Sequence, residues 1–492
     1  MSRSQAYHDE TKYRPETIAA HPGLDWDSKP ATTKCFHSED RIDLRPHLAL
    51  TRDDESQLPC LTSDLAEGDI DLRRLSTFLL HVYGVTAIAN DGNNEHTFRA
   101  APSAGALYPN EIYLALRDIE GLTDGIYNYQ VIDHALVPVC EGDFQGDLRH
   151  NFFDATATRA RCIVLVTAIF FRSAWRYHDR GYRRVLLDTG HLLGNAYSIA
   201  PYLSLQICAL PSFNDAGLAS LLWLNDEEEA VVAAFALDDL NTDGLRAPGA
   251  AASETVESDQ PKVCPEALHR GGYLATLTTS RDAVTPPAAP LGFEDLPSKT
   301  LRPEPLDWPS RICGTILMRR SAREFTGATI SRGALGTILA HSYTDWSGAE
   351  TAFHAPTALR TLIAIHGVEN LTPGLYEYEP ATGAVHLWRA GNFASQCCQI
   401  ALGQEIALHC AAMVVHTANL DRVDASFGDR GYRYLGLDAG LLGQRMNLTA
   451  EALGLGACGI GGYFDDQVNE LFKLPAGESV LYLTCLGVKG QD

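Results

Sequence analysis

The sequence Asp179-Arg180-Gly181-Tyr182-Arg183 returns unchanged as Asp429-Arg430-Gly431-Tyr432-Arg433. Each occurrence is followed by Leu-Asp-x-Gly, at residues 187–190 and 437–440. Upstream, Leu-Thr-x-Gly-x-Tyr-x-Tyr occurs at residues 122–129 and again at 371–378. Matches that keep the same order along the chain predict two copies of one domain, each with the same fold.

The repeat divides the 492 residues into four segments. We expect a first domain at residues 58–241 and a second domain at residues 306–492. Residues 242–305 are rich in Ala, Pro, Ser and Glu, which indicates a linker with at most a short ordered piece. Residues 1–57 are polar with scattered aromatic residues, which indicates an extension that wraps around the core.

The hydrophobic pattern within one copy predicts both helices and strands. Residues 72–82 have helical amphipathic spacing, and residues 182–205 are apolar on nearly every side, which predicts a helix buried all round. Apolar or alternating runs predict strands at residues 111–116, 125–129, 162–168 and 230–237. The fold class is therefore α+β, an antiparallel-rich sheet flanked by helices in each domain. The buried long helices predict that the two domains pack together as an intrachain pseudo-dimer.

Composition argues against several classes of protein. The net charge of −23 disfavours nucleic acid and anionic membranes as partners. The 12 cysteines lack paired zinc spacing, so we expect free thiols and no metal site. The polar N-terminus predicts no signal peptide, and no uninterrupted apolar run reaches about 18 residues. Together these features predict a cytoplasmic protein without a transmembrane helix.

Residues 317–325, Leu-Met-Arg-Arg-Ser-Ala-Arg-Glu-Phe, contain the most distinctive cluster of side chains in the chain. Arg319, Ser321 and Arg323 alternate, so they can face one way in an extended segment ahead of the next helix. Guanidinium groups bind phosphate oxygens in pairs, and this cluster therefore suits a phosphate dianion. Taken alone, such a string is more typical of a solvated basic helix entrance, and the phosphate interpretation depends on the rest of the chain.

The first copy lacks this cluster. In an ungapped comparison its matching residues are Pro59, Leu61 and Ser63, and Asp239 stands where the second copy has Lys489. The second copy also has a glycine-rich run at residues 453–462, whereas the first copy has no glycine at residues 203–212. Glycines allow close approach of the backbone to a ligand, so only the second copy keeps a phosphate-binding end.

The opposite difference occurs at residues 103–109, Ser-Ala-Gly-Ala-Leu-Tyr-Pro. From the preceding proline to the shared Leu-Thr, the second copy is five residues shorter and has no full counterpart of this loop. The hydroxyl and backbone N–H groups of such a loop can contact a polar heterocycle. The two copies therefore complement each other and predict one complete site built from both.

These segments resemble the FMN-dependent nitroreductase superfamily. The resemblance lies in Arg-x-Ser-x-Arg-x-Phe at 319–325, Pro-Ser-Ala-Gly-x-Leu-Tyr-Pro at 102–109, Gly-Leu-Gly-Ala-Cys-Gly-Ile-Gly-Gly at 454–462 and Leu-Gly-x-Lys at 486–489. With Tyr-His-Asp-Glu-Thr-Lys at 7–12, the loop and Gly-x-Tyr-x-Tyr also resemble the SagB-type dehydrogenases, which include azoline oxidases of thiazole- and oxazole-modified peptides. The resemblance implies a dimeric α+β fold with FMN at the interface. In this tandem chain we expect one FMN per chain.

The resemblance also implies roles for individual residues. The FMN phosphate and ribityl chain would be held by Arg319, Arg320, Ser321, Arg323 and Lys489. The isoalloxazine ring would lie by Gly461 and Gly462. From the first copy it would be covered by Pro102, Ser103, Ala104, Gly105 and Leu107.

Candidate catalytic residues lie ahead of the long helix of the first copy. The azoline oxidases resemble one another in a Lys-Tyr pair there, proposed as acid and base, where this chain has Arg176 and Tyr177. Arginine stays protonated and is a poor base, but Tyr177 could relay a proton. Equally, Arg176 could form a helix-start ion pair and Tyr177 could be a packing aromatic. Tyr108 is a further candidate. Three histidines are expected to be structural: His81 and His341 at the interface of the copies, and His191 in the core.

The predicted function is an FMN-dependent oxidoreductase. The expected reaction is a two-electron oxidation of a peptide-derived or other natural-product intermediate, of the azoline-to-azole type, with O₂ reoxidising the flavin. One alternative is an NAD(P)H-dependent nitro- or quinone reductase. Another is a non-catalytic flavin-binding or docking subunit of a biosynthetic complex. The expected partners are a small-molecule or peptide substrate and other proteins of such a complex.

Overall fold

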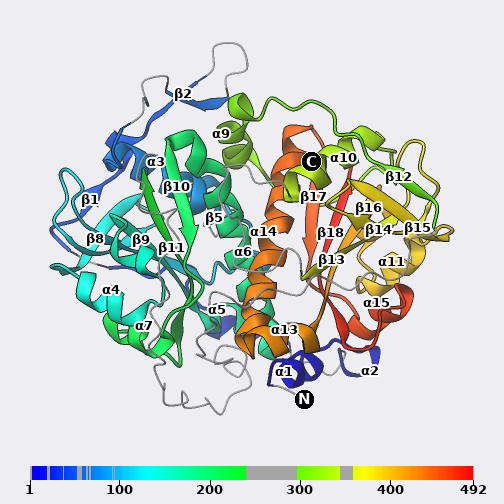
Figure 1. The fold of residues 1–492 in the computed structure, drawn as a ribbon, viewed down its shortest axis with the longest axis horizontal. Helices are drawn as coiled ribbons and strands as arrows, with labels where there is room; N and C mark the ends of the chain where they lie inside the picture. Colours follow the sequence, from blue (N-terminus) through cyan, green and yellow to red (C-terminus); the bar gives the residue numbers. More distant parts are fainter. Residues whose placement is uncertain are drawn as a thin grey trace.

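The computed structural model describes residues 3–18, 23–36, 38–52, 58–62, 65, 68–90, 92, 95–239, 296–343 and 358–490. Two domains of similar size lie side by side, with one long helix of each at their boundary (Figure 1). The N-terminal helix lies at the lower end of this boundary in the same view.

Each domain contains one seven-stranded antiparallel sheet, and the two sheets have the same strand order. The first runs β1 (Ile42–Asp43), β8 (Ala135–Glu141), β7 (Gly125–Gln130), β6 (Asn110–Leu116), β9 (Cys162–Ile169), β11 (Glu229–Asp239), β10 (Leu205–Ala209). The second runs β12 (Ser298–Thr300), β15 (Ala384–Ala390), β14 (Gly374–Glu379), β13 (Leu359–Ile365), β16 (Ala412–Asn419), β18 (Glu478–Gly487), β17 (Gly456–Ile460). The central strands β9 and β16 are almost wholly buried, as expected for apolar strands covered on both faces. The predicted α+β fold with two like domains is confirmed.

Helices cover these sheets in matching positions. In the first domain they are α3 (Leu72–Tyr83), α4 (Gln145–Asn151), α5 (Phe170–Tyr177), α6 (Gly181–Ile199) and α7 (Asp215–Leu221). In the second they are α10 (Arg332–Tyr343), α11 (Ala394–Ile400), α12 (Glu405–His409), α13 (Leu420–Phe427), α14 (Arg430–Ala452) and α15 (Asp465–Leu471). Outside this repeat lie α1 (Arg3–Glu10), α2 (Pro15–Ile18), α9 (Trp308–Met318) and two hairpins, β2 (Leu50–Arg52) with β3 (Pro59–Leu61) and β4 (Val85–Asn90) with β5 (Glu95–Arg99).

The helices α6 and α14 cross at the glycines of the repeated Leu-Asp-x-Gly. A Cβ at Gly190 would overlap the carbonyl oxygen of Leu437, and a Cβ at Gly440 would overlap that of Leu187. The two backbones are therefore in contact, which only glycine permits at this crossing. The two helices are buried along nearly their whole lengths. The predicted intrachain pseudo-dimer is thus present, and the repeat explains its symmetry.

The repeated Asp-Arg-Gly-Tyr-Arg joins the domains through two matching ion-pair triads. Arg180 and Arg183 of the first domain each donate to one oxygen of Asp465, at 2.7 Å in both cases. In the reciprocal triad Arg430 and Arg433 donate to Asp215, at 2.5 and 2.7 Å. Burial disfavours ionisation of these aspartates, but the paired arginines outweigh it and hold the pKa of both below the usual range.

The N-terminal extension lies at one end of this interface. The ring of Tyr7 in α1 lies edge-on to Tyr182 and to Tyr432, with ring centroids 6.0 and 5.7 Å away. These two tyrosines come from the two copies of the repeat, so α1 contacts both domains at once. His8 also reaches the second domain, with Nδ1 3.0 Å from the hydroxyl of Tyr432.

The end of one predicted helix differs from the sequence prediction. The helix predicted at residues 182–205 ends at Ile199; a 3-10 turn containing Pro201 follows, and Leu205 starts β10. The proline lacks an N–H donor and Ser204 adopts a left-handed conformation with φ 55°, so the chain turns there. The three-residue strand β12 lies within the segment predicted as a linker with at most a short ordered piece, and it forms the edge of the second sheet. The other domain boundaries stay predictions.

Candidate functional site

The basic segment at residues 319–323 follows the end of α9 and runs beside β17. The backbone N–H of Ala322 donates to the carbonyl of Ala457 at 3.0 Å, and Phe325 forms an antiparallel bridge with Lys489. The structure therefore brings Lys489, near the C-terminus, next to the arginines, as predicted. A Cβ at Gly456 would overlap the side chain of Lys489, which explains why this position of the glycine-rich run is a glycine.

This segment also touches the first domain. Arg319 Nε donates to the carbonyl of Ala100 at 3.4 Å, two residues before the predicted covering loop. Arg320 Nη2 donates to the carbonyl of Thr86 in β4 at 3.2 Å. The cluster therefore lies at the boundary between the domains, where the resemblance places the FMN phosphate.

The cations of this segment are poorly compensated. Arg319 is 4% exposed, and its side-chain hydrogen bonds go to a backbone carbonyl and to the hydroxyl of Ser321. Burial and the neighbouring charge of Arg320 lower the pKa of Arg319 to about 10. Among the described residues, no carboxylate forms an ion pair with Arg319, Arg320 or Arg323. Lys489 does have a partner, since its Nζ lies 2.6 Å from Glu451. A buried guanidinium group without an anion is costly, so this donor set fits an external phosphate.

Across the interface, the loop at residues 102–109 is tied to α6 by Asp188. The Ser103 hydroxyl donates to Asp188 Oδ2 at 2.6 Å, and the Ala104 N–H donates to Asp188 Oδ1 at 3.1 Å. The loop contains three residues with positive φ, Gly105 at 66°, Ala106 at 53° and Tyr108 at 47°. Two of these are not glycine, which marks a backbone held by its surroundings in a strained conformation. Burial raises the pKa of Asp188 to about 7, although the two loop hydrogen bonds and Arg184 act in the opposite direction.

The candidate catalytic residues lie at the end of α5. Arg176 is exposed and Tyr177 is partly buried. A Cβ at Gly105 would lie 3.0 Å from the Tyr177 hydroxyl and 3.2 Å from Arg176 Cδ, so both side chains border the loop. Burial raises the pKa of Tyr177, partly offset by Arg184 and Arg176. Tyr177 therefore keeps its proton at neutral pH and can donate it.

Other predicted residues lie around this centre. The Tyr108 hydroxyl accepts from the Arg99 N–H at 3.3 Å, and the Arg99 guanidinium stacks between the rings of Tyr83 and Tyr108. Leu107 is buried, and a Cβ at Gly462 would lie 3.0 Å from Leu402. The catalytic role of Tyr108 stays a prediction.

Of the three histidines predicted to be structural, His81 and His191 have the predicted contacts. His81 Nε2 lies 3.0 Å from Cys313 Sγ in α9, so this histidine is at the interface as predicted. His191 Nδ1 donates to the carbonyl of Leu187 at 2.7 Å, and its Nε2 lies 3.1 Å from the Tyr482 hydroxyl. His191 is hydrogen-bonded in the core, as predicted. His341 packs against Trp308 of α9, with ring centroids 5.9 Å apart, and its place at the interface stays a prediction.

The reciprocal face of the interface is occupied by structural contacts. Pro211, the counterpart of Gly461, accepts hydrogen bonds from Arg430 Nε at 3.2 Å and from the Tyr434 hydroxyl at 3.0 Å. Asp239 forms an ion pair with Arg161 in its own domain. Ser63 and residues 356 and 357 lie outside the described part of the chain.

The predicted correspondence of Asp239 with Lys489 was wrong by one residue. Ile207 pairs with Leu237 in the first sheet, whereas its counterpart Ala457 pairs with Leu486 in the second. The last strands are therefore offset by one residue relative to an ungapped comparison, and Asp239 corresponds to Val488. Asp239 thus does not occupy the position of a phosphate-binding cation.

Comparison with known proteins agrees with the repeated fold. The family model described as the nitroreductase family matches residues 72–237 and 316–488. The chain belongs to the nitroreductase family. A crystal structure of a nitroreductase homologue from Anabaena variabilis superposes with a TM-score of 0.88 at 35% identity, over 100% of both chains. The tandem of nitroreductase domains is thus shared by another protein of the family.

Two relatives named as processing proteins each match about 150 residues of the chain. Microcin B17-processing protein McbC of Escherichia coli is 30% identical over 151 residues, which are 30% of this chain and 56% of McbC. Trifolitoxin-processing protein TfxB of Rhizobium leguminosarum bv. trifolii is 29% identical over 150 residues, 29% of this chain and 39% of TfxB. These relatives support the narrower resemblance to SagB-type nitroreductases. A nitroreductase homologue from Methanocaldococcus jannaschii is 32% identical over 164 residues, 33% of this chain and 79% of that protein.

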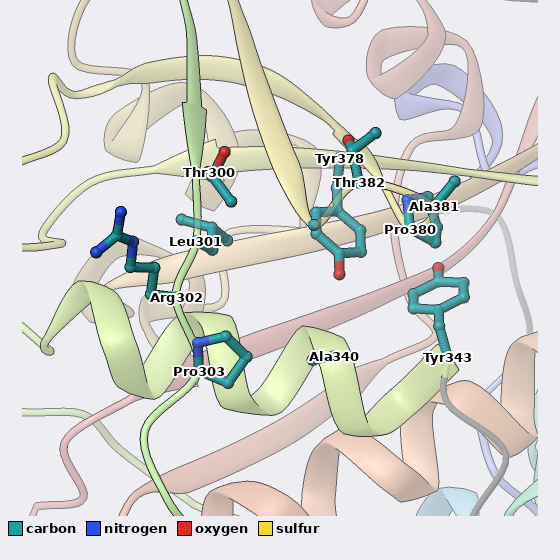
Figure 2. A pocket seen from close by; sticks show the side chains of 11 residues that line it. Thr300, Leu301, Arg302, Pro303, Ala340, Tyr343, Tyr378, Pro380, Ala381 and Thr382 are labelled. Carbon is teal, nitrogen blue, oxygen red and sulfur yellow. The ribbon is translucent and has the colours of Figure 1, made fainter.

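A cavity of about 540 Å³ lies elsewhere in the nitroreductase fold, on the second domain alone. Figure 2 shows Tyr343 of α10, Tyr378 of β14 and Pro303 around it. None of the predicted site residues lines this cavity. Among the described residues, no cluster of His, Cys, Asp or Glu could hold a metal ion, and no helix is long and apolar enough to span a membrane.

Two residues of this nitroreductase site were missed by the sequence analysis. Asp188 belongs to the repeated Leu-Asp-x-Gly, so its signal pointed to the scaffold rather than to the loop it holds. Arg184 follows the repeated Asp-Arg-Gly-Tyr-Arg directly, and its counterpart is Tyr434. A comparison of the two copies at this position would have shown a cation present in only one of them.

Proposed function

We propose that this chain is an FMN-dependent oxidoreductase that holds one FMN across its two domains. The observation that carries the proposal is Arg319, which is buried at the interface without a carboxylate partner among the described residues, beside the half-buried Arg320 and the exposed Arg323. Arg319 donates to the carbonyl of Ala100 in the first domain, close to the loop that Asp188 holds. On the opposite face of the interface, Pro211 is the counterpart of Gly461, and its carbonyl accepts a hydrogen bond from the Tyr434 hydroxyl of the protein itself.

The expected roles of the residues of this chain follow from their positions at this interface. Arg319, Ser321 and Arg323 would bind the FMN phosphate and ribityl chain, and Lys489 would add a charge shared with Glu451. Gly461 and Gly462 would leave room for the isoalloxazine ring, and Pro102, Ser103, Ala104 and Gly105 would cover it. Bound FMN supplies hydride transfer, which no side chain can perform. Tyr177 would deliver or accept a proton at the substrate, and the loop would exclude water.

The substrate class that we favour is a peptide-derived or other natural-product intermediate, oxidised by two electrons. The names of McbC and TfxB, processing proteins of a microcin and of trifolitoxin, support this choice. Such an enzyme would work with the other proteins of a biosynthetic complex. O₂ would reoxidise the flavin.

An NAD(P)H-dependent nitro- or quinone reductase is the second candidate. It is favoured by the family match and by the homologue from Methanocaldococcus jannaschii, of which 79% is covered. A non-catalytic docking subunit is less favoured, because a protein that had lost its cofactor would not need uncompensated buried arginines.

The test is the absorption spectrum of the purified protein and the flavin released by heat per mole of chain. We expect a yellow protein with a ratio near one. Anaerobic addition of NADH or NADPH separates the two candidates, because only the reductase should be bleached rapidly. The Arg319→Ala, Lys489→Ala double variant should lose most of the flavin, since each charged contact contributes about 1.5–3 kcal/mol. A ratio near two would contradict the single site, and a colourless protein that cannot bind added FMN would contradict the function.

A further inference from the structure

A second uncompensated cation lies in α6, apart from the basic segment. Arg184 is 3% exposed, and its guanidinium group forms no hydrogen bond or ion pair with any residue of the described ranges. Its Nη2 is fully enclosed without a hydrogen-bond partner. Burying a charge in this way is unfavourable unless an anion joins it. The carboxylate one helical turn away, Asp188, is already bonded to Ser103 and Ala104.

The position of this guanidinium group is defined from both domains. It lies against Gly461 of the second domain, because a Cβ at that position would overlap Arg184 Nη1. Its central carbon is 5.2 Å from the centre of the Tyr177 ring. Arg184 is thus held between the glycine expected beside the isoalloxazine ring and the tyrosine expected to handle the substrate proton.

Arg184 and the basic segment lie at different ends of the site. The basic segment lies at the start of β17, where the Ala322 N–H donates to the Ala457 carbonyl at 3.0 Å. Arg184 lies against Gly461, just past the other end of this strand, which is about 13 Å further along for a rise of about 3.3 Å per residue. FMN has a single phosphate, and the segment at residues 319–323 accounts for it. Arg184 therefore needs a different anion.

We propose that Arg184 binds a carboxylate of the substrate beside the flavin ring, so that the enzyme selects substrates with an acidic group. This inference rests on the proposed flavin site. A planar guanidinium group accepts a carboxylate through two parallel hydrogen bonds, which orients the substrate as well as binding it. The reciprocal position holds Tyr434, bonded to the Pro211 carbonyl, so the other face offers no such cation.

The experiment titrates the flavin-loaded protein with benzoate and with benzamide, which have nearly the same shape and differ in charge. Binding is followed by the change in the flavin absorption band. We expect benzoate to bind about 10- to 100-fold more tightly than benzamide, the range given by one charge-assisted pair. Arg184→Gln should remove this preference without changing benzamide binding, and Arg184→Lys should keep part of it. Arg149→Gln, an exposed arginine of α4, is the control and should behave as the wild type.

A second variant covers the case in which Arg184→Gln does not fold. In Gly461→Ala the added methyl group would displace the guanidinium group, so the preference for benzoate should fall here as well. Equal binding of the two probes by the yellow wild type would overturn the inference and leave the proposed function standing. Equal binding of benzoate and benzamide, together with a lower flavin midpoint potential in Arg184→Gln, would show that Arg184 stabilises the reduced flavin. This result would also overturn the inference. A wild type unable to bind FMN would instead remove the proposed function.

Discussion

On one face of the domain interface, Arg184 lies against Gly461 beside the ring of Tyr177; on the other face the same three positions hold Tyr434, Pro211 and Phe427. The second set is closed by the hydrogen bond from Tyr434 to Pro211 and by an edge-on contact of Phe427 with Tyr434, ring centroids 5.7 Å apart. The first set leaves a buried cation without a hydrogen-bond or ion-pair partner in the part of the chain that the structure describes. Two faces built on one scaffold have therefore separated into a candidate ligand site and a structural joint.

The scaffold itself has stayed symmetric. Both ion-pair triads and both glycines of the helix crossing are retained, because each of them holds the domains together whichever face carries the ligand. By contrast, the three positions that would touch a ligand differ between the copies: Arg184, Gly461 and Tyr177 correspond to Tyr434, Pro211 and Phe427. Mutation of either of two matching scaffold residues should therefore lower the unfolding free energy. Mutation of a site residue should change ligand binding only on the face that carries the ligand.

The largest effect is expected at the triads. In Asp465→Asn, Arg180 and Arg183 lose a carboxylate that is 0% exposed, and unfolding free energy should fall by about 3–5 kcal/mol. Asp215→Asn should lower the unfolding free energy by less, because the Asp215 side chain is 15% exposed and water can partly solvate the arginines that lose their partner. Urea denaturation measures both. Asp466→Asn, at an exposed neighbour, is the control and should change stability by less than about 1 kcal/mol. An equal cost for Asp465 and Asp215 would show that exposure does not distinguish the two triads.

The helix crossing should respond more weakly and equally on both sides. Gly190→Ala and Gly440→Ala each place a methyl group onto the backbone of the other helix, which should cost about 1–3 kcal/mol of unfolding free energy. Thermal unfolding of the two variants tests this. Gly146→Ala in α4 is the matched control, since a Cβ there meets nothing within 4 Å. A clear difference between Gly190→Ala and Gly440→Ala would break the symmetry claimed for the scaffold.

The flavin site should respond on one face only. Arg319→Ala should weaken FMN binding about 10- to 100-fold, the effect of losing one charged contact of about 1.5–3 kcal/mol. Pro59→Ala, at the matching position of the first copy, should leave FMN binding unchanged. Fluorescence titration of the flavin-free protein measures both. Unchanged binding in Arg319→Ala would remove the phosphate assignment.

The scaffold could be predicted from the sequence because the repeated motifs are short, contiguous and in the same order in both copies. The matches at residues 179–183 and 429–433 implied equal folds, and the apolar long helices implied their packing. The basic segment and the loop at residues 102–109 were likewise visible as differences between the copies. Contacts that depend on the crossing of α6 and α14, such as Arg184 against Gly461, join residues far apart and leave no local pattern. Asp188 was hidden because it belongs to a motif that both copies share, so its signal pointed to the scaffold. The one-residue offset of the last strands was invisible to an ungapped comparison, which misplaced Asp239.

The smallest expected effect concerns the pH dependence of the loop anchor, Asp188. Burial raises the pKa of Asp188 to about 7, above the value that an aspartate has in an unfolded chain. Between these two values the folded protein binds one proton more than the unfolded chain, so this group makes stability fall as pH rises, until about pH 7. Asp188→Asn cannot titrate and lacks this slope. From pH 6 to pH 7 the wild type should therefore lose about 1 kcal/mol of unfolding free energy relative to Asp188→Asn. Ser103→Ala, which removes a hydrogen bond that favours the ionised form, should move the end of the slope to higher pH. Urea denaturation at several pH values measures the unfolding free energy of the wild type and of both variants as a function of pH. Parallel curves for the wild type and Asp188→Asn would mean that the carboxyl group is already ionised at pH 6. Its hydrogen bonds to Ser103 and Ala104 would then be those of a permanent anion.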